Sequence, residues 1–165
     1  PSDQLFCATV WDDVAFGLQN MGYSPVDVAD RVQTALELTG VAELAKRPPH
    51  HLSGGQKRMV AIAGIIAMQP QVVLYDEPSA NLDLRARRRL IEFLQQSRQN
   101  ASKTTIISSH DLELLLEVCD RVLLIDGGCI VADGDPQTIM SDAPLMHQHG
   151  LEKPHSLLPH SDPHH

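Results

Sequence analysis

A short apolar run that ends in two carboxylates constrains the fold of this chain more than any other feature. The run is Val72–Tyr75, and Asp76 and Glu77 follow it directly. Four consecutive apolar residues are typical of a strand that is covered on both faces of a parallel sheet. Ligands of such sheets bind outside the carboxyl ends of the strands. The run therefore predicts an α/β fold with a polar site where this strand ends.

The pattern of the chain changes at this strand. Residues 1–70 show helical periodicity, with helices expected over 25–39 and 54–68, and form a predicted helical subdomain with a preceding loop. Residues 71–145 alternate strands and helices and predict a mostly parallel sheet that ends in a hairpin. Residues 146–165 hold six of the nine histidines among prolines and predict a flexible tail.

Composition excludes several classes of function. A net charge of −8 and an aromatic content of 4% argue against a nucleic-acid partner. The three cysteines form no C-x-x-C pair, so they are expected to be small buried residues in a reducing compartment. No apolar run approaches the roughly 18 residues that a membrane span needs.

A second motif, Ser53-Gly54-Gly55-Gln56, predicts a helix start that is open to an anion. Ser53 and Gln56 have the spacing of a capping box. Two glycines in the first turn leave backbone N–H groups uncovered at the positive end of the helix dipole. Such an end binds phosphate readily, although a purely structural cap has the same sequence.

The strand end offers complementary chemistry. A Mg²⁺ ion would stabilise Asp76, and Glu77 would orient or deprotonate a water that attacks a phosphoryl group. His110 follows a second expected strand, 104–108, after two serines. It is expected at the same sheet edge, as a phosphate contact or as a structural residue.

Four motifs in order carry a family resemblance: Leu-Ser-Gly-Gly-Gln (52–56), Leu-Tyr-Asp-Glu-Pro (74–78), Ser-Ala-Asn-Leu-Asp (79–83) and Ser-Ser-His-Asp (108–111). With them, residues 1–140 strongly resemble the ATP-binding subunit of ABC transporters. The resemblance implies a nucleoside-triphosphatase fold of the P-loop type, with ATP and Mg²⁺ as cofactors.

The resemblance also assigns roles in a head-to-tail dimer with a second ATPase subunit. The signature motif, Ser53, Gly54, Gly55 and Gln56, would close on the γ-phosphate of the partner's ATP. Asp76 as the Walker B aspartate, Glu77 as the catalytic glutamate and His110 as the switch histidine would serve the subunit's own site, and Asp83 matches the D-loop.

Residues 1–6 and 12–17, together with His149–His155, resemble a narrower group, the ATPases of energy-coupling-factor importers. That resemblance implies an enzyme at the cytoplasmic face of the membrane that works with transmembrane subunits. It would power the uptake of cobalt, nickel or a vitamin.

The phosphate loop of this family, G-x-x-x-x-G-K-[ST], is not in the sequence, because no glycine is followed by lysine. The resemblance places that loop upstream of Pro1. We therefore expect this chain to be the carboxy-terminal part of an ATPase that is inactive by itself.

Other classes of protein share part of this pattern. A soluble ABC ATPase would carry coiled coils or a second cassette, which are not seen here. A truncated, non-catalytic ABC module has the same sequence. A metal-binding accessory role would use tail histidines as ligands: His147, His149, His155 and His160.

Overall fold

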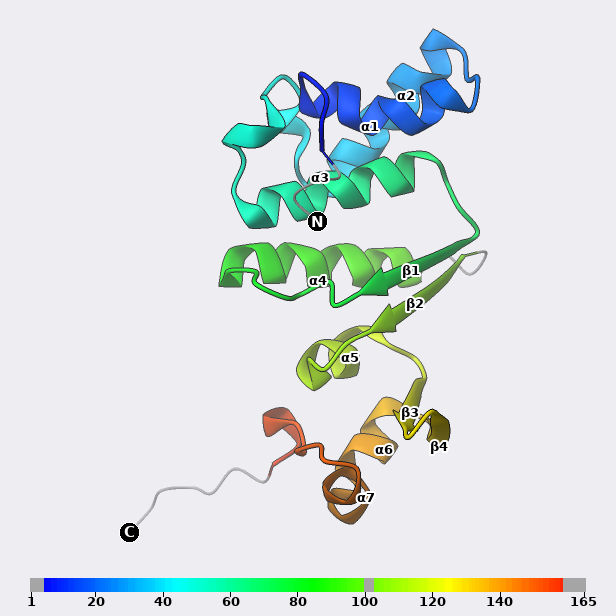
Figure 1. Ribbon diagram of the computed structural model, residues 1–165, viewed down its shortest axis with the longest axis vertical. Helices are drawn as coiled ribbons and strands as arrows, with labels where there is room; N and C mark the ends of the chain where they lie inside the picture. Colours follow the sequence, from blue (N-terminus) through cyan, green and yellow to red (C-terminus); the bar gives the residue numbers. More distant parts are fainter. Residues whose placement is uncertain (1–4, 100–102, 159–165) are drawn as a thin grey trace. The chain divides into compact units, whose positions relative to one another are not determined.

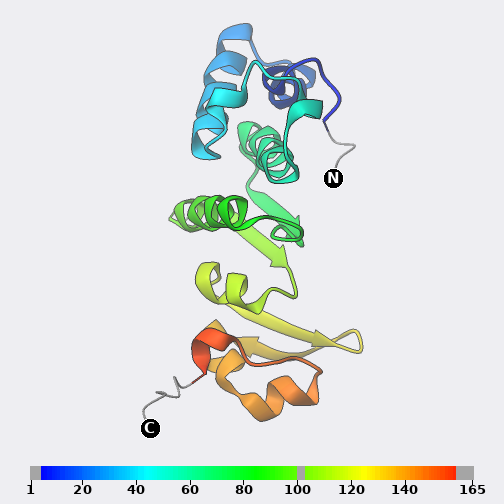
Figure 2. The same cartoon turned by 90° about the vertical axis from the view of Figure 1, so that its left-hand side faces the viewer.

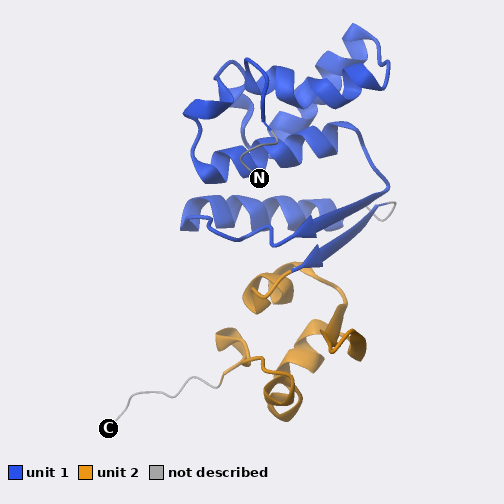
Figure 3. Cartoon of the chain, viewed as in Figure 1, with its two compact units in different colours: residues 1–108 blue, residues 109–165 orange. Residues whose placement is uncertain are grey.

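The computed structural model describes residues 5–99 and 103–158, and the chain forms two compact units. Unit 1 comprises residues 1–108 and unit 2 comprises residues 109–165 (Figure 3). Each unit is described by itself. Unit 1 contains the predicted helical region together with the first two strands, and unit 2 contains the hairpin and the histidine-rich end of the chain.

Unit 1 begins with three packed helices (Figure 1): α1 (Val10–Asn20), α2 (Pro25–Leu38) and α3 (Gly54–Ala67). Two short 3₁₀ turns, Ala42–Leu44 and Pro49–His51, connect α2 to α3. Apolar side chains at helical spacing form the core between the helices, among them Val14, Leu18, Val32, Leu36 and Val60. The predicted helices over 25–39 and 54–68 are confirmed.

A two-stranded parallel sheet follows, made of β1 (Val72–Asp76) and β2 (Thr104–Ser108). Between the two strands the chain forms α4 (Leu84–Arg98), so the segment is a β-α-β unit (Figure 2). The register pairs Asp76 with Ser108, which brings the carboxyl ends of both strands together.

The burial of β1 corrects one expectation. Val73 and Tyr75 are buried and line a cavity of about 160 Å³ with Ile66 of α3 and Phe93 of α4. Val72 and Leu74 are 50% and 71% exposed, and β2 is also largely exposed. The sheet is covered on one face, because the described residues of unit 1 supply helices for that face alone.

Unit 2 is built around an antiparallel hairpin, β3 (Val122–Asp126) and β4 (Cys129–Gly134). Gly127 and Gly128 form its turn with φ values of 55° and 78°, which glycine adopts without strain. The predicted hairpin is confirmed, with its turn in the sequence Asp126-Gly127-Gly128. Within the described residues β3 pairs with β4 and with no parallel strand, and Cys129 is exposed rather than buried.

Helices pack against this hairpin: α5 (Leu112–Val118), α6 (Pro136–Ser141), α7 (Ala143–Gln148) and the 3₁₀ turn η4 (His155–Leu157). Val122, Ile139, Met140 and Met146 form the buried centre of the unit. Asp111, Asp135 and Asp142 each accept a hydrogen bond from a backbone N–H in the first turn of the following helix.

Residues 146–158 correct the prediction of a flexible tail. Met146 is 1% exposed, and Leu151 and Leu157 pack on the same apolar centre. Pro154, one of the prolines that suggested disorder, is the N-cap of the short helical turn η4, and Pro159 and Pro163 lie outside the described residues. We call residues 149–158 the C-terminal segment.

Contacts of the C-terminal segment with Glu113 are expected to make stability depend on pH. Hydrogen bonds donated by Ser156 lower the pKa of Glu113, because they stabilise its charged form. This stabilisation is fully present above the unfolded-state pKa of about 4.3 and is lost as the pH falls through the lower folded-state pKa. We expect an NMR titration to show the pKa of Glu113 rising toward its ordinary value in Ser156→Ala. An unchanged titration would contradict the hydrogen bonds.

No helix in the described ranges, 5–99 and 103–158, is long and apolar enough to cross a bilayer.

Candidate nucleotide site

The start of α3 has the hydrogen bonds that its sequence predicts. The Ser53 hydroxyl oxygen accepts from the Gln56 N–H at 3.3 Å, and the Gln56 side-chain oxygen accepts from the Ser53 N–H at 2.9 Å. This reciprocal pair is a capping box. It fixes the first turn of α3, so that its remaining N–H groups have a defined direction.

The two glycines of the motif differ in what surrounds them. A Cβ atom at Gly55 would lie 2.5 Å from the Cβ of Ala86 in α4, so this glycine is required by helix packing. A Cβ atom at Gly54 would meet nothing within 4 Å. The missing side chain at Gly54 therefore has no packing reason inside the described residues. The backbone at Gly54 is therefore accessible to a ligand.

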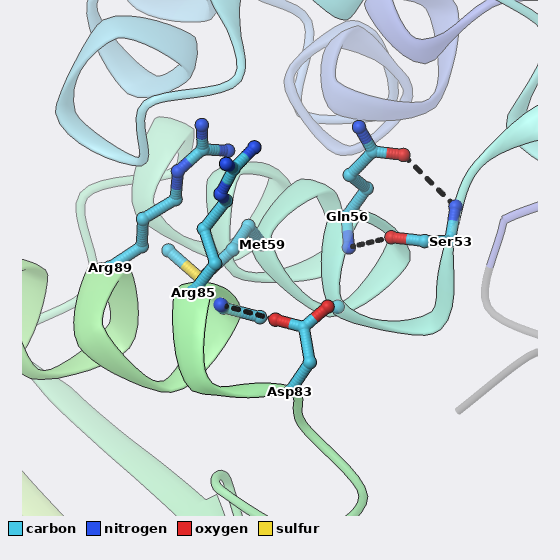
Figure 4. A pocket seen from close by; sticks show the side chains of 8 residues that line it. Ser53, Gln56, Met59, Asp83, Arg85 and Arg89 are labelled. Carbon is cyan, nitrogen blue, oxygen red and sulfur yellow. Dashed lines mark hydrogen bonds between the residues drawn. The ribbon is translucent and has the colours of Figure 1, made fainter.

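A cavity of about 180 Å³ lies beside this helix start. Figure 4 shows Ser53 and Gln56 of α3 on one side and Asp83, Arg85 and Arg89 of α4 on the other. Arg85 and Arg89 are four residues apart, so both side chains extend from the same face of α4. Two guanidinium groups beside a helix N-terminus create a positive environment for an anion.

These two arginines were not predicted as site residues. The sequence signal is their i, i+4 spacing in the helix that Asp83 starts, and it gains meaning only when α4 is known to pack against α3.

Asp83, the predicted D-loop aspartate, is the N-cap of α4. Its Oδ1 accepts from the Ala86 N–H at 2.7 Å. The structure therefore brings Asp83 into the same cavity as Ser53, Gly55 and Gln56.

The carboxylates at the end of β1 lie outside the set of residues that line this cavity. Asp76 is exposed, and its Oδ1 accepts from the Ser108 hydroxyl at 3.1 Å. Glu77 has a left-handed backbone, φ 44°, and its N–H donates to the Ser108 carbonyl at 2.8 Å. Left-handed backbone in a residue other than glycine is strained and is concentrated at functional sites. The Ser108 bonds hold both carboxylate residues at the strand end.

The Asp76 carboxylate fits a Mg²⁺ ion whose other ligands are phosphate and water oxygens. An exposed carboxylate can ligate such an ion directly or through water. Among the described residues no three His, Cys, Asp or Glu side chains gather into a metal site of their own. The neighbour Tyr75 stays neutral, because burial raises the pKa of Tyr75 to about 12.

His110 belongs to unit 2 and follows Ser108, the last residue of β2, by two positions. Its carbonyl accepts from the Leu112 N–H at 3.1 Å, at the start of α5. Its part in catalysis stays a prediction.

Three of the four predicted tail ligands, His147, His149 and His155, are among the described residues. His149 Nδ1 lies 2.7 Å from Asp126 Oδ2, so this ring nitrogen already has a protein partner. His147 and His155 are at the C-terminal end of α7 and the start of η4. His160 lies outside the described residues. A tail metal site stays a prediction.

Comparisons with known proteins agree with this α/β arrangement. Residues 11–117 match the family model described as "AAA domain, putative AbiEii toxin, Type IV TA system". A Synechocystis protein named "Putative ABC transporter ATP-binding protein sll0385" is 61% identical over 95% of this chain and 54% of its own length. The energy-coupling factor transporter ATP-binding protein EcfA of Carboxydothermus hydrogenoformans is 44% identical over 93% of this chain and 56% of its own length.

A solved structure agrees as well. It is cbiO1 from Clostridium perfringens, described as part of the ABC transporter complex cbiONQ, with a TM-score of 0.79 and 35% identity over 90% of this chain and 59% of that one. The chain belongs to the matched AAA-domain family, and its relatives are ATP-binding proteins of ABC transporters. It spans slightly more than half the length of the curated relatives described here.

Proposed function

We propose that this chain is the signature-bearing part of an ATP-hydrolysing subunit that powers an importer of the energy-coupling-factor type. One observation carries the proposal. The first turn of α3 is fixed by its capping box and by close packing at Gly55, it is open at Gly54, and its residues Ser53, Gly55 and Gln56 line a cavity with two arginines. A helix start built in this way suits a phosphate group.

The separation of the two sets of site residues supports action in a dimer. Ser53, Gly55 and Gln56 of the signature line one cavity with Asp83, Arg85 and Arg89, whereas Asp76 and Glu77 are outside that lining. Ser53, Gly54, Gly55 and Gln56 would therefore contact the ATP of a second ATPase subunit, identical or different. Asp76 and Glu77 would act on this subunit's own ATP.

In the hydrolytic site, Asp76 would hold Mg²⁺, which neutralises charge on the phosphates. Glu77 would accept a proton from the attacking water, and its backbone bond to Ser108 would keep the carboxylate in place. His110 would contact the γ-phosphate. At the other half-site, donors at Gly54 and the arginines would stabilise the charge that develops on the transferred phosphoryl group.

We further propose that the subunit binds peripherally to transmembrane partners at the cytoplasmic face of the membrane. The cargo would be a metal ion such as cobalt or nickel, or a vitamin. The likeness to EcfA and to cbiO1, which is part of the complex cbiONQ, supports this assignment.

Direct binding of ATP gives a first test. The 165-residue chain contains no G-x-x-x-x-G-K-[ST] cradle, so we expect isothermal titration to give a dissociation constant for Mg-ATP weaker than about 1 mM. The complete protein, assembled with its partner subunits, is expected to hydrolyse ATP. Micromolar binding by the chain alone would show that it binds ATP tightly without this cradle and would overturn that expectation. An inactive complete assembly would overturn the proposed function.

A further inference from the structure

We infer that the C-terminal segment positions His110: Ser156 holds Glu113 and thereby fixes α5, the helix that begins directly after His110. This inference rests on the proposed function, in which His110 contacts the γ-phosphate. Ser156 and Glu113 are positioning residues, since neither is proposed to touch nucleotide.

The contact between Ser156 and Glu113 joins residues 43 positions apart in the chain. The Ser156 N–H donates to Glu113 Oε1 at 3.1 Å, and the Ser156 hydroxyl donates to Oε2 at 2.7 Å. Both carboxylate oxygens are therefore engaged by one residue. Hydrogen bonds to a charged acceptor are about twice as strong as neutral ones, and the paired geometry fixes orientation as well as distance.

Glu113 lies in the first turn of α5, close to His110. Asp111 caps this helix by accepting from the Leu114 N–H at 3.0 Å, and the Leu112 N–H donates to the His110 carbonyl at 3.1 Å. His110 is thus bonded to the residue that begins α5. A shift of the first turn of α5 would move the backbone of His110.

Helix α5 needs outside support because it has seven residues. Isolated helices this short are unstable in water, so their position depends on the groups packed around them. Part of this support is apolar and comes from the buried cluster of unit 2, Val122, Ile139, Met140 and Met146, against which both α5 and the C-terminal segment pack. Leu151 and Leu157 share the apolar cluster of unit 2 with the α5 residues Leu112, Leu115 and Leu116.

The C-terminal segment is bonded to the hairpin at its start and forms a closed turn near its end. At its start, His149 Nδ1 lies 2.7 Å from Asp126 Oδ2, where β3 ends. Near its end, the Leu157 N–H donates to the Pro154 carbonyl at 3.0 Å and closes the turn that presents Ser156. The segment is consequently a fixed support for α5.

The test uses the complete protein assembled with its partner subunits. Ser156→Ala removes one donor to Glu113, and we expect kcat for ATP hydrolysis to fall about ten-fold with the KM for Mg-ATP unchanged, since small displacements of catalytic groups lower rates steeply. Ser156→Thr keeps the hydroxyl and should keep kcat within about two-fold of the unmodified protein.

A matched control is Asp133→Asn. It removes the acidic charge from the exposed pair in which Asp133 Oδ2 lies 2.6 Å from Arg121, on the hairpin of the same unit. We expect no change in kcat. A second readout, the imidazole C–H resonance of His110 by NMR, should shift in Ser156→Ala and stay in place in Asp133→Asn.

The outcomes separate the two proposals. If Ser156→Ala leaves kcat unchanged in an active assembly, the inference is wrong, whether or not the His110 resonance moves. If the unmodified assembly does not hydrolyse ATP, the proposed function fails, and the His110 resonance alone then decides whether Ser156 positions this residue.

Discussion

Replacing Glu77 with glutamine in the complete protein is expected to lower kcat by about 100- to 10,000-fold, while ATP still binds. Glutamine keeps the size of the side chain but cannot accept the proton of the attacking water. The left-handed backbone of Glu77 and its bond to Ser108 do not depend on the carboxylate, so the local geometry should persist. Steady-state ATPase assays and equilibrium binding of labelled ATP measure the two quantities.

Asp76→Asn gives a useful contrast to Glu77→Gln. Asp76 is proposed to hold Mg²⁺, so Asp76→Asn should raise the Mg²⁺ concentration that gives half-maximal activity. Glu77→Gln should leave that concentration unchanged. Glu77→Gln that retains more than a tenth of the original kcat would rule out Glu77 as the general base.

Gly54→Asp is expected to lower kcat by at least about 100-fold without lowering the thermal unfolding midpoint. The added carboxylate would stand where the phosphate is proposed to bind and would repel it, and one lost stabilising donor already costs 100- to 1,000-fold in other enzymes. No atom within 4 Å opposes a side chain at this position, and an acidic residue in the first turn of a helix is favourable. Differential scanning calorimetry beside an ATPase assay separates activity from stability.

Gly55→Ala is the matched control, since it is expected to lower the unfolding midpoint, which Gly54→Asp should not. Its Cβ would clash with Ala86, so the unfolding midpoint should fall, and Gly55→Ala combined with Ala86→Gly should recover much of the loss. A Gly54→Asp protein that hydrolyses ATP normally would show that the start of α3 is a structural cap alone.

Local signals in the sequence were sufficient for much of the fold. Ser24-Pro25 marks the start of α2, Ser53 and Gln56 mark that of α3, and Asp-Gly-Gly marks the hairpin. Each of these features depends on residues that are close in sequence. The family of the chain was also predictable, because four short motifs in fixed order specify it.

Long-range contacts were not predictable in the same way. The apolar run Val72–Tyr75 gives no information on which face is covered, since that depends on where α3 and α4 pack. The close approach of Gly55 to Ala86, the arginines beside the signature and the bond from Ser156 to Glu113 each join elements that the sequence separates. Residues 146–158 of the predicted flexible tail were misjudged for the same reason: their position depends on Met146, Leu151 and Leu157, which pack in the apolar cluster of unit 2.

The cap of α3 also determines what kind of guest it can distinguish. The Ser53 oxygen already accepts from the Gln56 N–H, and among the described residues no acceptor is bonded to its hydroxyl hydrogen. Towards a ligand, this hydroxyl, the glycine N–H groups and the two guanidinium groups all present hydrogens. Most polar groups at this helix start are donors, with the Asp83 carboxylate as the exception, and such a surface favours the more highly charged form of a phosphate. Affinity at this half-site should therefore increase with the negative charge of the terminal phosphate. The signature helix would then bind differently to different ionisation states of the same nucleotide.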